Sequence, residues 1–320
     1  MTTNTKLAFI FPGQGSQATG MLAELAAAYP LVEQTFAEAG DILGYDLWQL
    51  VQQGPESELN QTDRTQPAML TAGVAVWRVW QSQTDIVPAQ MAGHSLGEYT
   101  ALVCSGALDF ADAVALVRDR GQYMQDAIAA GDGAMAAILG LDDDTVRQAC
   151  AAAAQGDIVA AVNFNAPGQV VIAGQTQAVK RAIDAAKAAG AKRAVELPVS
   201  VPSHCSLMQP AADMMAKRLA DIHIDAPDIA VINNVDVASC NDADAIRAAL
   251  IRQLYSPVRW VETIQAMQNT GIETIVECGP GKVLAGLNKR IARTMTVVAL
   301  YDSASLRQAQ EVLQTAEEAS

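Results

Sequence analysis

The sequence predicts an α/β protein in which helices cover both faces of a mostly parallel sheet, with a smaller unit of strands and helices inserted into it. Short apolar segments alternate with longer helical patterns along most of the 320 residues, as is typical of a parallel sheet. Hydrophobic residues make up 51% of the chain, enough for one large domain or two smaller ones. A glycine-flanked serine between an expected strand and an expected helix is the first candidate for a functional site.

The chain before that serine predicts one strand and several helical segments. Its Trp77 and Trp80 are expected in the core, because they lie on an apolar helix. The expected elements are a strand at residues 6–11, a helix at 22–39 with further helix at 42–48, a polar loop at 55–65 and a buried helix at 66–80.

A glycine-rich loop follows the first strand. Residues 12–18, Pro-Gly-Gln-Gly-Ser-Gln-Ala, resemble the dinucleotide-binding fingerprint. That fingerprint requires a second strand ending in an acidic residue about 20 positions further on, and the residues that follow predict helix instead. We therefore interpret the segment as a loop whose backbone N–H groups face the serine.

Residues 86–108 combine a strand, a sharp turn and a helix. A buried strand is expected at 86–92, the turn Gly-His-Ser-Leu-Gly follows at 93–97, and the residues from 98 to 108 are rich in Ala and Leu. This is the arrangement of a nucleophile elbow, whose turn directs the side chain of Ser95 away from the backbone. The helix that follows points free N–H groups at a developing oxyanion. The alternative is a chance Gly-x-Ser-x-Gly in a turn, which the flanking strand and helix disfavour.

The middle of the chain predicts a unit of its own. Asp109 can cap a helix that runs to about residue 130, and Gly-Asp-Gly at 131–133 then breaks the chain. The elements that follow have the order β-α-β-β-α-β of a split βαβ, ferredoxin-like unit. They are expected at 134–139, 142–155, 158–163, 169–173, 176–189 and 192–199. We predict an inserted subdomain at 131–199 and a catalytic body at 1–130 and 200–320.

The last third of the chain returns to the body. Helices are expected near residues 207–220, 243–255 and 258–271, and strands near 229–233, 273–277 and 296–300. This alternation completes a mostly parallel sheet.

Composition excludes several classes of function. The net charge of −14 disfavours nucleic acid as a partner, because a phosphate backbone would be repelled. No apolar run approaches the ~20 residues of a membrane-spanning helix, and residues 1–6 do not resemble the start of a signal peptide. The five cysteines are scattered without a Cys-x-x-Cys pair, and only three histidines are present. We therefore expect neither a metal site nor disulfides, and we predict a reducing cytoplasm as the compartment.

A serine nucleophile needs a base, usually a histidine. His94 is a poor candidate because neighbouring side chains in a sharp turn diverge, and it is expected to line the pocket. His223 lies in an alternating segment that predicts a solvated strand. His204 follows a proline-stiffened junction between the two predicted units, so elimination favours it and leaves the other two open. The acids available to orient the base are Asp236, Asp242, Asp244 and Glu277, and context marks out none of them.

Several motifs together carry a resemblance to a known family. They occur in order over nearly the whole chain, so the match does not depend on any single motif. The chain closely resembles the malonyl-CoA:acyl carrier protein transacylases of bacterial fatty acid synthesis. The motifs are Phe-Pro-Gly-Gln-Gly-Ser-Gln at 11–17, Gly-His-Ser-Leu-Gly-Glu-Tyr at 93–99, Arg120, Val-Asn-Phe-Asn at 162–165, Val-Ser-Val-Pro-Ser-His at 199–204 and Arg-Gln-Leu at 252–254.

The resemblance implies a fold and a role for each site residue. The fold is an α/β-hydrolase-like body with a ferredoxin-like insertion. Ser95 would be the nucleophile, His204 the base and Arg120 the group that binds the malonyl carboxylate. The backbone carbonyl of Gln253 would orient the base in place of an acid. The backbone N–H groups of Gln14 and Leu96 would form the oxyanion hole, and His94 and Asn165 would line the pocket.

The resemblance also implies a ping-pong reaction. A malonyl-serine ester would form from malonyl-CoA, and the phosphopantetheine thiol of acyl carrier protein would then take the malonyl group. No cofactor or metal is implied, and we expect a cytoplasmic monomer whose partners are acyl carrier protein and coenzyme A thioesters. The alternatives are an acyltransferase of a polyketide synthase, a serine thioesterase or other hydrolase, and a non-catalytic carrier-protein docking module.

Charged residues supply two further predictions. Periodicity does not choose between Arg118 and Arg120 as the carboxylate-binding residue, since the two flank the apolar stripe of their helix on opposite sides. Carrier proteins are acidic, so local basic clusters must overcome the overall negative charge. We define an insert cluster, Lys192 and Arg193, and a helix cluster, Lys289, Arg290 and Arg293.

Overall fold

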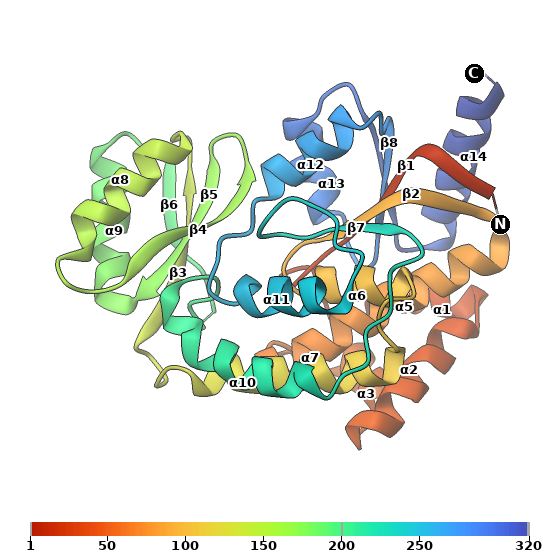
Figure 1. Ribbon diagram of the computed structural model, residues 1–320, viewed down its shortest axis with the longest axis horizontal. Helices are drawn as coiled ribbons and strands as arrows, with labels where there is room; N and C mark the ends of the chain where they lie inside the picture. The colour runs from red at the N-terminus through yellow and green to blue at the C-terminus, as the bar shows by residue number, and fades with distance from the viewer. Residues whose placement is uncertain (1, 200, 319–320) are drawn as a thin grey trace.

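The computed structural model describes residues 2–199 and 201–318. Ser200, part of the Val-Ser-Val-Pro-Ser-His motif, lies outside the described residues. Two sheets organise the chain, one in the body and one in a smaller unit beside it (Figure 1). No helix among the described residues is long and apolar enough to span a membrane.

The body is built on a five-stranded parallel sheet with the order β7-β2-β1-β8-β9. Both faces of its central strand are buried. Leu7, Phe9 and Phe11 of β1 pack into one hydrophobic core, and the alternate Ala8 and Ile10 pack into another. The strands are β1 (Thr2–Phe11), β2 (Ile86–Gly93), β7 (Ala230–Ile232), β8 (Thr274–Cys278) and β9 (Thr296–Leu300).

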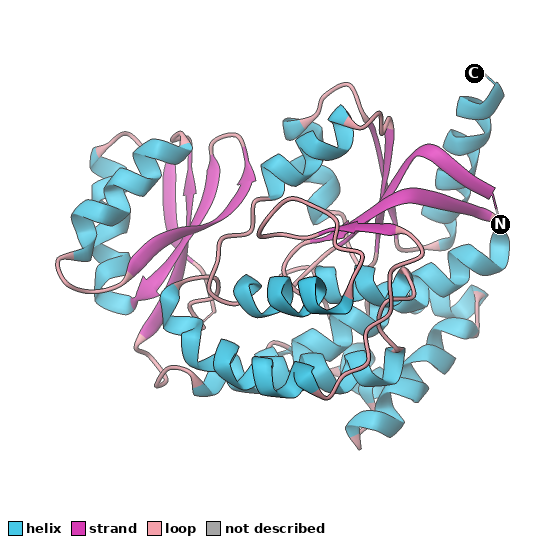
Figure 2. Cartoon of the chain, in the orientation of Figure 1, coloured by secondary structure: helices cyan, strands magenta, loops and turns pink. Residues whose placement is uncertain are grey.

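Helices cover both faces of this sheet (Figure 2). The core on the Phe9 side takes residues from α1 (Ala23–Ala28), α2 (Leu31–Leu43), α3 (Leu47–Gln53), α4 (Glu56–Leu59), α5 (Thr62–Gln83), α6 (Gly97–Cys104), α7 (Phe110–Asp126), α10 (Gln209–Ala220), α11 (Ala243–Gln253) and α14 (Ser303–Glu318). The core on the Ile10 side takes residues from α12 (Trp260–Asn269) and α13 (Val283–Ile291). A short 3₁₀ turn, η1 (Ser206–Met208), precedes α10.

The smaller unit has its own antiparallel sheet, with the order β4-β5-β3-β6. Two helices pack on one face of this sheet and close a separate hydrophobic core. We call residues 133–196 the insert. Its elements are β3 (Gly133–Leu139), α8 (Asp143–Ala154), β4 (Val159–Ala166), β5 (Gln169–Gln175), α9 (Thr176–Ala188) and β6 (Arg193–Glu196).

The predicted fold class is confirmed: a mostly parallel sheet with helices on both faces, and a β-α-β-β-α-β unit beside it. Trp77 and Trp80 are buried against Phe9, as expected. The domain limits at 131–199 stay a prediction.

Several element boundaries were predicted wrongly, for local reasons. The helix expected at 22–39 is divided at Pro30, and the helix expected at 42–48 is interrupted at Gly44, which adopts a positive φ of 77°. The segment expected as a loop at 55–65 contains α4 and the start of α5. The last strand of the insert, expected at 192–199, is only four residues long. The C-terminal helix α14 was not predicted.

Candidate active site

Ser95 lies on a tight turn between β2 and α6. Its backbone is in the left-handed region, with φ of 50°, a conformation that is strained for a residue with a side chain. Glycine is required at the two flanking positions, 93 and 97, for a steric reason. A Cβ on Gly93 would lie 1.8 Å from the carbonyl carbon of Gly97, and a Cβ on Gly97 would lie 2.1 Å from the carbonyl oxygen of Phe11. The Gly-x-Ser-x-Gly pattern is therefore what allows the strand, the turn and the helix to pack this closely.

His204 completes a hydrogen-bonded pair with the serine. Its Nε2 lies 2.8 Å from Ser95 Oγ, and its Nδ1 lies 2.7 Å from the carbonyl oxygen of Gln253. A carbonyl oxygen only accepts hydrogen bonds, so Nδ1 carries the proton and Nε2 is left as an acceptor for the serine hydroxyl. The backbone of His204 is also in the left-handed region, with φ of 67°, and its N–H donates to the carbonyl of Leu254. Both partners of the pair are thus held by backbone geometry.

The surroundings of His204 favour its neutral form. Its side chain is buried, and burial is the main cause that lowers the pKa of the imidazole to about 3, with the nearby Arg120 guanidinium as the second cause. The hydrogen bond to Gln253 acts in the opposite direction. An unperturbed histidine titrates near pH ~6.5, so the buried His204 is expected to stay neutral, and able to accept the serine proton, at lower pH than that.

The four acids considered as partners of the base all have other contacts. Asp236 pairs with Arg252, Asp244 pairs with Arg247, and Asp242 caps the first turn of α11. Buried Glu277 accepts from the N–H groups of Leu284 and Ala285 at the start of α13. Within the described ranges, the acceptor at His204 Nδ1 is thus a backbone carbonyl.

The other two histidines lie in different surroundings. His94 is half-buried and its Nε2 is 2.8 Å from Asn165 Oδ1, so these two predicted pocket residues contact each other. Burial lowers the pKa of His94. His223 is 81% exposed and pairs with Asp225 in a loop after α10, so the strand predicted there was wrong.

Arg120 reaches the nucleophile from α7. Its Nη2 lies 3.3 Å from Ser95 Oγ and 3.0 Å from Gln253 Oε1, and its Nη1 lies 2.8 Å from Gln66 Oε1. The side chain is 1% exposed. Arg118 instead lies near the surface and pairs with Asp119 at 2.7 Å. The structure therefore separates the two arginines that periodicity could not.

The Arg120 charge is buried beside the nucleophile without an anion. Its hydrogen-bond acceptors are two amide oxygens and one hydroxyl, and no ion pair within the described part of the chain includes it. Burial lowers its pKa. A buried cation held only by neutral groups is costly unless an anion joins it, so the site is suited to a substrate that carries a carboxylate next to the reacting carbonyl.

The backbone N–H of Leu96, the residue after the serine, has no hydrogen-bond partner among the described residues, and neither has that of Gln14 in the glycine-rich loop. The N–H of Ser95 is not available, because it donates to Asn234 Oδ1 at 2.7 Å. The glycine-rich loop is packed closely against the elbow: a Cβ on Gly13 would lie 2.4 Å from the carbonyl oxygen of His94.

Three side chains at the site were not identified from the sequence. Gln66 holds Arg120, Asn234 bonds both Ser95 N and the carbonyl of Gly93, and Glu98 accepts from Asn234 and from Gln253. Glu98 stands in the quoted Gly-His-Ser-Leu-Gly-Glu motif, which could have pointed to it. Gln66 and Asn234 come from distant segments, and nothing in their local sequence distinguishes them.

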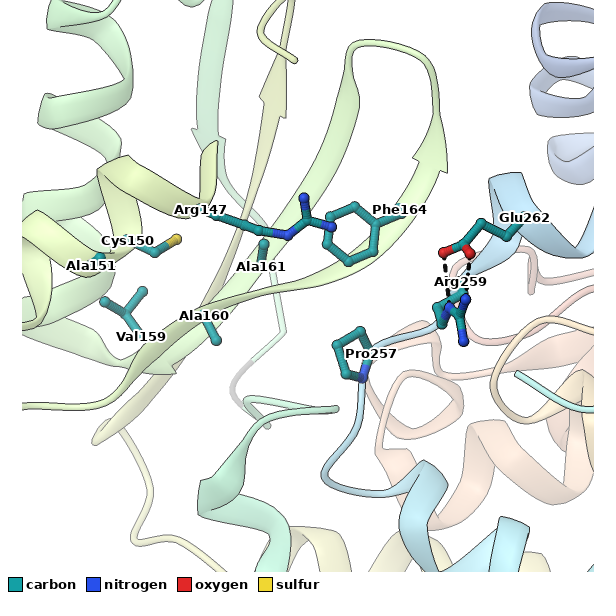
Figure 3. Close-up of a pocket in the computed structure, with 10 residues that line it drawn as sticks. All are labelled: Arg147, Cys150, Ala151, Val159, Ala160, Ala161, Phe164, Pro257, Arg259 and Glu262. Atoms are coloured by element: carbon teal, nitrogen blue, oxygen red, sulfur yellow. Dashed lines mark hydrogen bonds and ion pairs between the residues drawn. The ribbon is translucent and has the colours of Figure 1, made fainter. Parts of the chain in front are cut away.

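A cavity of about 380 Å³ lies between the insert and the body, on the α8 side of β4 (Figure 3). Its two arginines already have partners: Arg147 lies over the Phe164 ring, and Arg259 forms an ion pair with Glu262. Phe164 packs into the core of the insert, whereas the next residue, Asn165, contacts His94. The cavity is therefore separated from the serine by β4.

Comparison with known proteins agrees with this geometry. Residues 8–313 match the family model of the acyl transferase domain. The chain is 60% identical over 308 residues to the malonyl CoA-acyl carrier protein transacylase of Escherichia coli strain K12, covering 96% of this chain and 100% of that protein. A crystal structure of an acyl carrier protein S-malonyltransferase from Vibrio cholerae is 61% identical with a TM-score of 0.93, covering 95% of this chain and 100% of that one.

A further solved structure is a malonyl-transacylase in complex with its type II PKS acyl-carrier protein. It is 59% identical with a TM-score of 0.95, and it covers 96% of this chain and 99% of that one. The fold, the site and the family model together identify the chain as an acyltransferase. The chain belongs to the malonyl-CoA:acyl carrier protein transacylase family, which confirms the resemblance inferred from the motifs.

Proposed function

We propose that this protein transfers the malonyl group from malonyl-CoA to the phosphopantetheine thiol of acyl carrier protein, through an ester on Ser95. The single observation that carries the proposal is a buried arginine, Arg120, placed 3.3 Å from the hydroxyl of a serine that also contacts a neutral histidine. The reacting carbonyl and the carboxylate of malonyl are separated by one methylene. An arginine this close to the nucleophile can therefore reach the carboxylate while the serine attacks.

In the first half-reaction, Ser95 Oγ attacks the thioester carbonyl as His204 Nε2 takes the hydroxyl proton. The oxygen of the tetrahedral intermediate accepts hydrogen bonds from the N–H groups of Gln14 and Leu96. The C–S bond then breaks, and the coenzyme A sulfur leaves with the proton held by His204. A malonyl ester remains on Ser95.

In the second half-reaction, the carrier-protein thiol gives its proton to His204 and its sulfur attacks the ester carbonyl. The C–O bond to Ser95 breaks, and the serine oxygen recovers the proton. Gln253 keeps the imidazole in the required tautomer throughout, because its carbonyl holds the Nδ1 proton. A thioester is consumed and a thioester is formed, so the reaction is close to thermoneutral.

The proposed partners and setting follow from the same chemistry. The carrier protein is supported by the names of the relatives and by the solved carrier-protein complex. All bond changes are accounted for by the chain's own residues, so the proposal includes no cofactor or metal. We also propose that the protein is a monomer in the cytoplasm, because its five scattered cysteines are typical of a reducing compartment. The carrier protein of fatty acid synthesis is the proposed partner, and a carrier protein of polyketide synthesis is the alternative, since one solved relative is bound to a type II PKS acyl-carrier protein.

One experiment tests the proposal in two stages. The protein is incubated with malonyl-CoA and its intact mass is measured, followed by peptide mapping of the adduct; we expect one malonyl group on Ser95. Holo acyl carrier protein is then added, and we expect the adduct to disappear as malonyl-carrier protein appears. Loss of the adduct to free malonate at the same rate with and without carrier protein would identify a hydrolase instead. No adduct at all would refute the serine mechanism.

A further inference from the structure

Glu98 is a buried carboxyl group that the mechanism above does not use. It lies in the first turn of α6, three residues after the nucleophile, and is 2% exposed. One of its oxygens, Oε2, accepts two hydrogen bonds: from Gln253 Nε2 at 2.8 Å and from the backbone N–H of Asn234 at 2.9 Å. Burying a carboxyl group is costly unless such bonds satisfy it. The burial of Glu98 beside the site therefore indicates that it has a function there.

The partner of Glu98, the carboxamide of Gln253, has one possible orientation. Its Nε2 donates to Glu98 Oε2 and to the carbonyl oxygen of Ser95, and its Oε1 accepts from Arg120 Nη2 at 3.0 Å. An arginine can only donate, and a carbonyl oxygen can only accept. Because Glu98 Oε2 accepts a hydrogen bond and Arg120 Nη2 donates one, the amide nitrogen of Gln253 must face Glu98 and its amide oxygen must face Arg120.

The backbone of the same glutamine serves the base, because its carbonyl oxygen accepts from His204 Nδ1. The main chain of Gln253 therefore serves the base, whereas its side chain, held by Glu98 and by the Ser95 carbonyl, serves Arg120. We propose that Glu98 is a positioning residue for malonyl recognition: it holds the Gln253 carboxamide with its oxygen toward Arg120 and so fixes the guanidinium that meets the malonyl carboxylate. This inference rests on the proposed function.

The orientation does not depend on the charge of Glu98. Burial is the main cause that raises the pKa of this carboxyl to about 7, while Gln253, Asn234 and Arg120 act in the opposite direction and Asp236 adds to the rise. Both hydrogen bonds go to Oε2, which accepts them whether or not Oε1 carries a proton. A neutral carboxamide oxygen at this position can accept the same two bonds, which makes Glu98→Gln the conservative variant.

The test compares two substrates in acylation assays of the full-length protein. For each variant, kcat/KM is measured with malonyl-CoA and with acetyl-CoA, and the ratio of the two is the readout. We expect Glu98→Leu to lower this ratio about 10-fold, the effect of one buried hydrogen bond to a charged group. We expect Glu98→Gln to restore it to within about threefold of the wild type. Glu277→Leu is the matched control. It removes a buried carboxyl of β8 that accepts hydrogen bonds from the start of α13, and it should leave the ratio unchanged.

A double-mutant cycle adds a second measurement. Gln253→Leu removes the carboxamide but keeps the backbone carbonyl for His204, so it should lower the ratio as Glu98→Leu does. The double variant should lower it no further, because both changes break one chain of contacts. If Glu98→Leu does not fold, Gln253→Leu alone still tests the proposal, because it removes the carboxamide that links Glu98 to Arg120; an unchanged ratio in the folded Gln253→Leu protein would overturn the proposal.

Two other results would overturn the inference. One is an unchanged ratio in a folded Glu98→Leu protein, and the other is a ratio in Glu98→Gln as low as in Glu98→Leu, which would assign the effect to charge. The wild-type malonyl adduct on Ser95 is measured first in every series. Its absence counts against the proposed function, whereas its presence with either result above counts only against the role of Glu98.

Discussion

Replacing Arg120 by alanine is the most direct test of how the site selects its acyl group. The change removes a guanidinium whose two terminal nitrogens contact Gln66, Gln253 and the Ser95 hydroxyl. It leaves the Ser95–His204 pair in place, since those two residues bond each other and His204 also bonds the backbone carbonyl of Gln253. Malonyl and acetyl differ by one carboxylate, so a substrate that lacks the carboxylate reports what the arginine does for it.

The size of the effect follows from the number and kind of bonds lost. A hydrogen bond to a charged group contributes ~1.5–3 kcal/mol, which corresponds to roughly 10- to 150-fold in kcat/KM at ~1.4 kcal/mol per tenfold. Arg120 is 1% exposed, so solvent screens the interaction little. We expect Arg120→Ala to lower kcat/KM for malonyl-CoA by at least 10-fold. Acetyl-CoA should lose little or gain, because it no longer meets a buried, unpaired cation.

The assay measures acylation of the protein by each coenzyme A thioester, with two further variants as comparisons. Arg120→Lys keeps the charge but loses the two-pronged geometry, so it should lose less than Arg120→Ala. Arg118→Ala is the matched control, because Arg118 lies two residues away, paired with Asp119 near the surface. It should keep the wild-type preference for malonyl-CoA. Thermal unfolding of each variant shows whether the oxygens of Gln66 and Gln253, left without their donor, cost stability as well.

Two results would refute this reasoning. Equal losses for malonyl-CoA and acetyl-CoA in Arg120→Ala would mean that the arginine serves the fold or the serine and not the carboxylate. Loss of malonyl preference in Arg118→Ala would mean that the wrong arginine was chosen.

Three further predictions concern the nucleophile, the base and the carrier protein. Ser95→Ala should give no malonyl adduct by intact mass while keeping its circular dichroism spectrum, and an adduct of full occupancy would exclude Ser95 as the nucleophile. The acid limb of kcat/KM should lie well below pH 6.5, because burial and Arg120 lower the pKa of His204 to about 3 and only the neutral imidazole accepts the serine proton; a limb near pH ~6.5 in rapid-mixing acylation assays would contradict this. Charge reversal of Lys192 and Arg193, both exposed, should raise KM for carrier protein and leave KM for malonyl-CoA unchanged, whereas equal rises for both substrates would count against docking at the insert cluster.

The parts of the site that lie within one short segment could be predicted from the sequence. The elbow is determined locally by the strand, the Gly-x-Ser-x-Gly turn and the helix. Neighbouring backbone leaves no room for a Cβ at Gly93 or at Gly97, so both positions require glycine. The alternating order of elements also predicted both sheets. Breaks inside helical patterns were harder: the interruption at Gly44 and the short α4 depend on local turns within a sequence that is helical on average.

The parts that depend on long-range packing could not be predicted. The choice between Arg118 and Arg120 is made by α10 and α5, since Arg218 of α10 shares Asp119 with Arg118 and Gln66 of α5 holds Arg120. Asn234 contacts Ser95 across 139 positions of sequence. No periodicity within one helix carries such information, and at the sequence level only the family resemblance selected the arginine that lies beside Ser95 in the structure.

A backbone carbonyl as the partner of His204 is consistent with the buried Arg120. A carboxylate at Nδ1 would orient the imidazole equally well, but it would also lie close to the guanidinium, which contacts both Ser95 and Gln253. The two charges would pair, and the malonyl carboxylate would then have to displace an internal anion. The neutral carbonyl of Gln253 holds the proton of Nδ1 without this competition. The Gln253 carboxamide lies between Glu98 and Arg120. Arg120 is therefore oriented by the Gln253 oxygen without forming an ion pair with Glu98, and its charge stays available for the malonyl carboxylate.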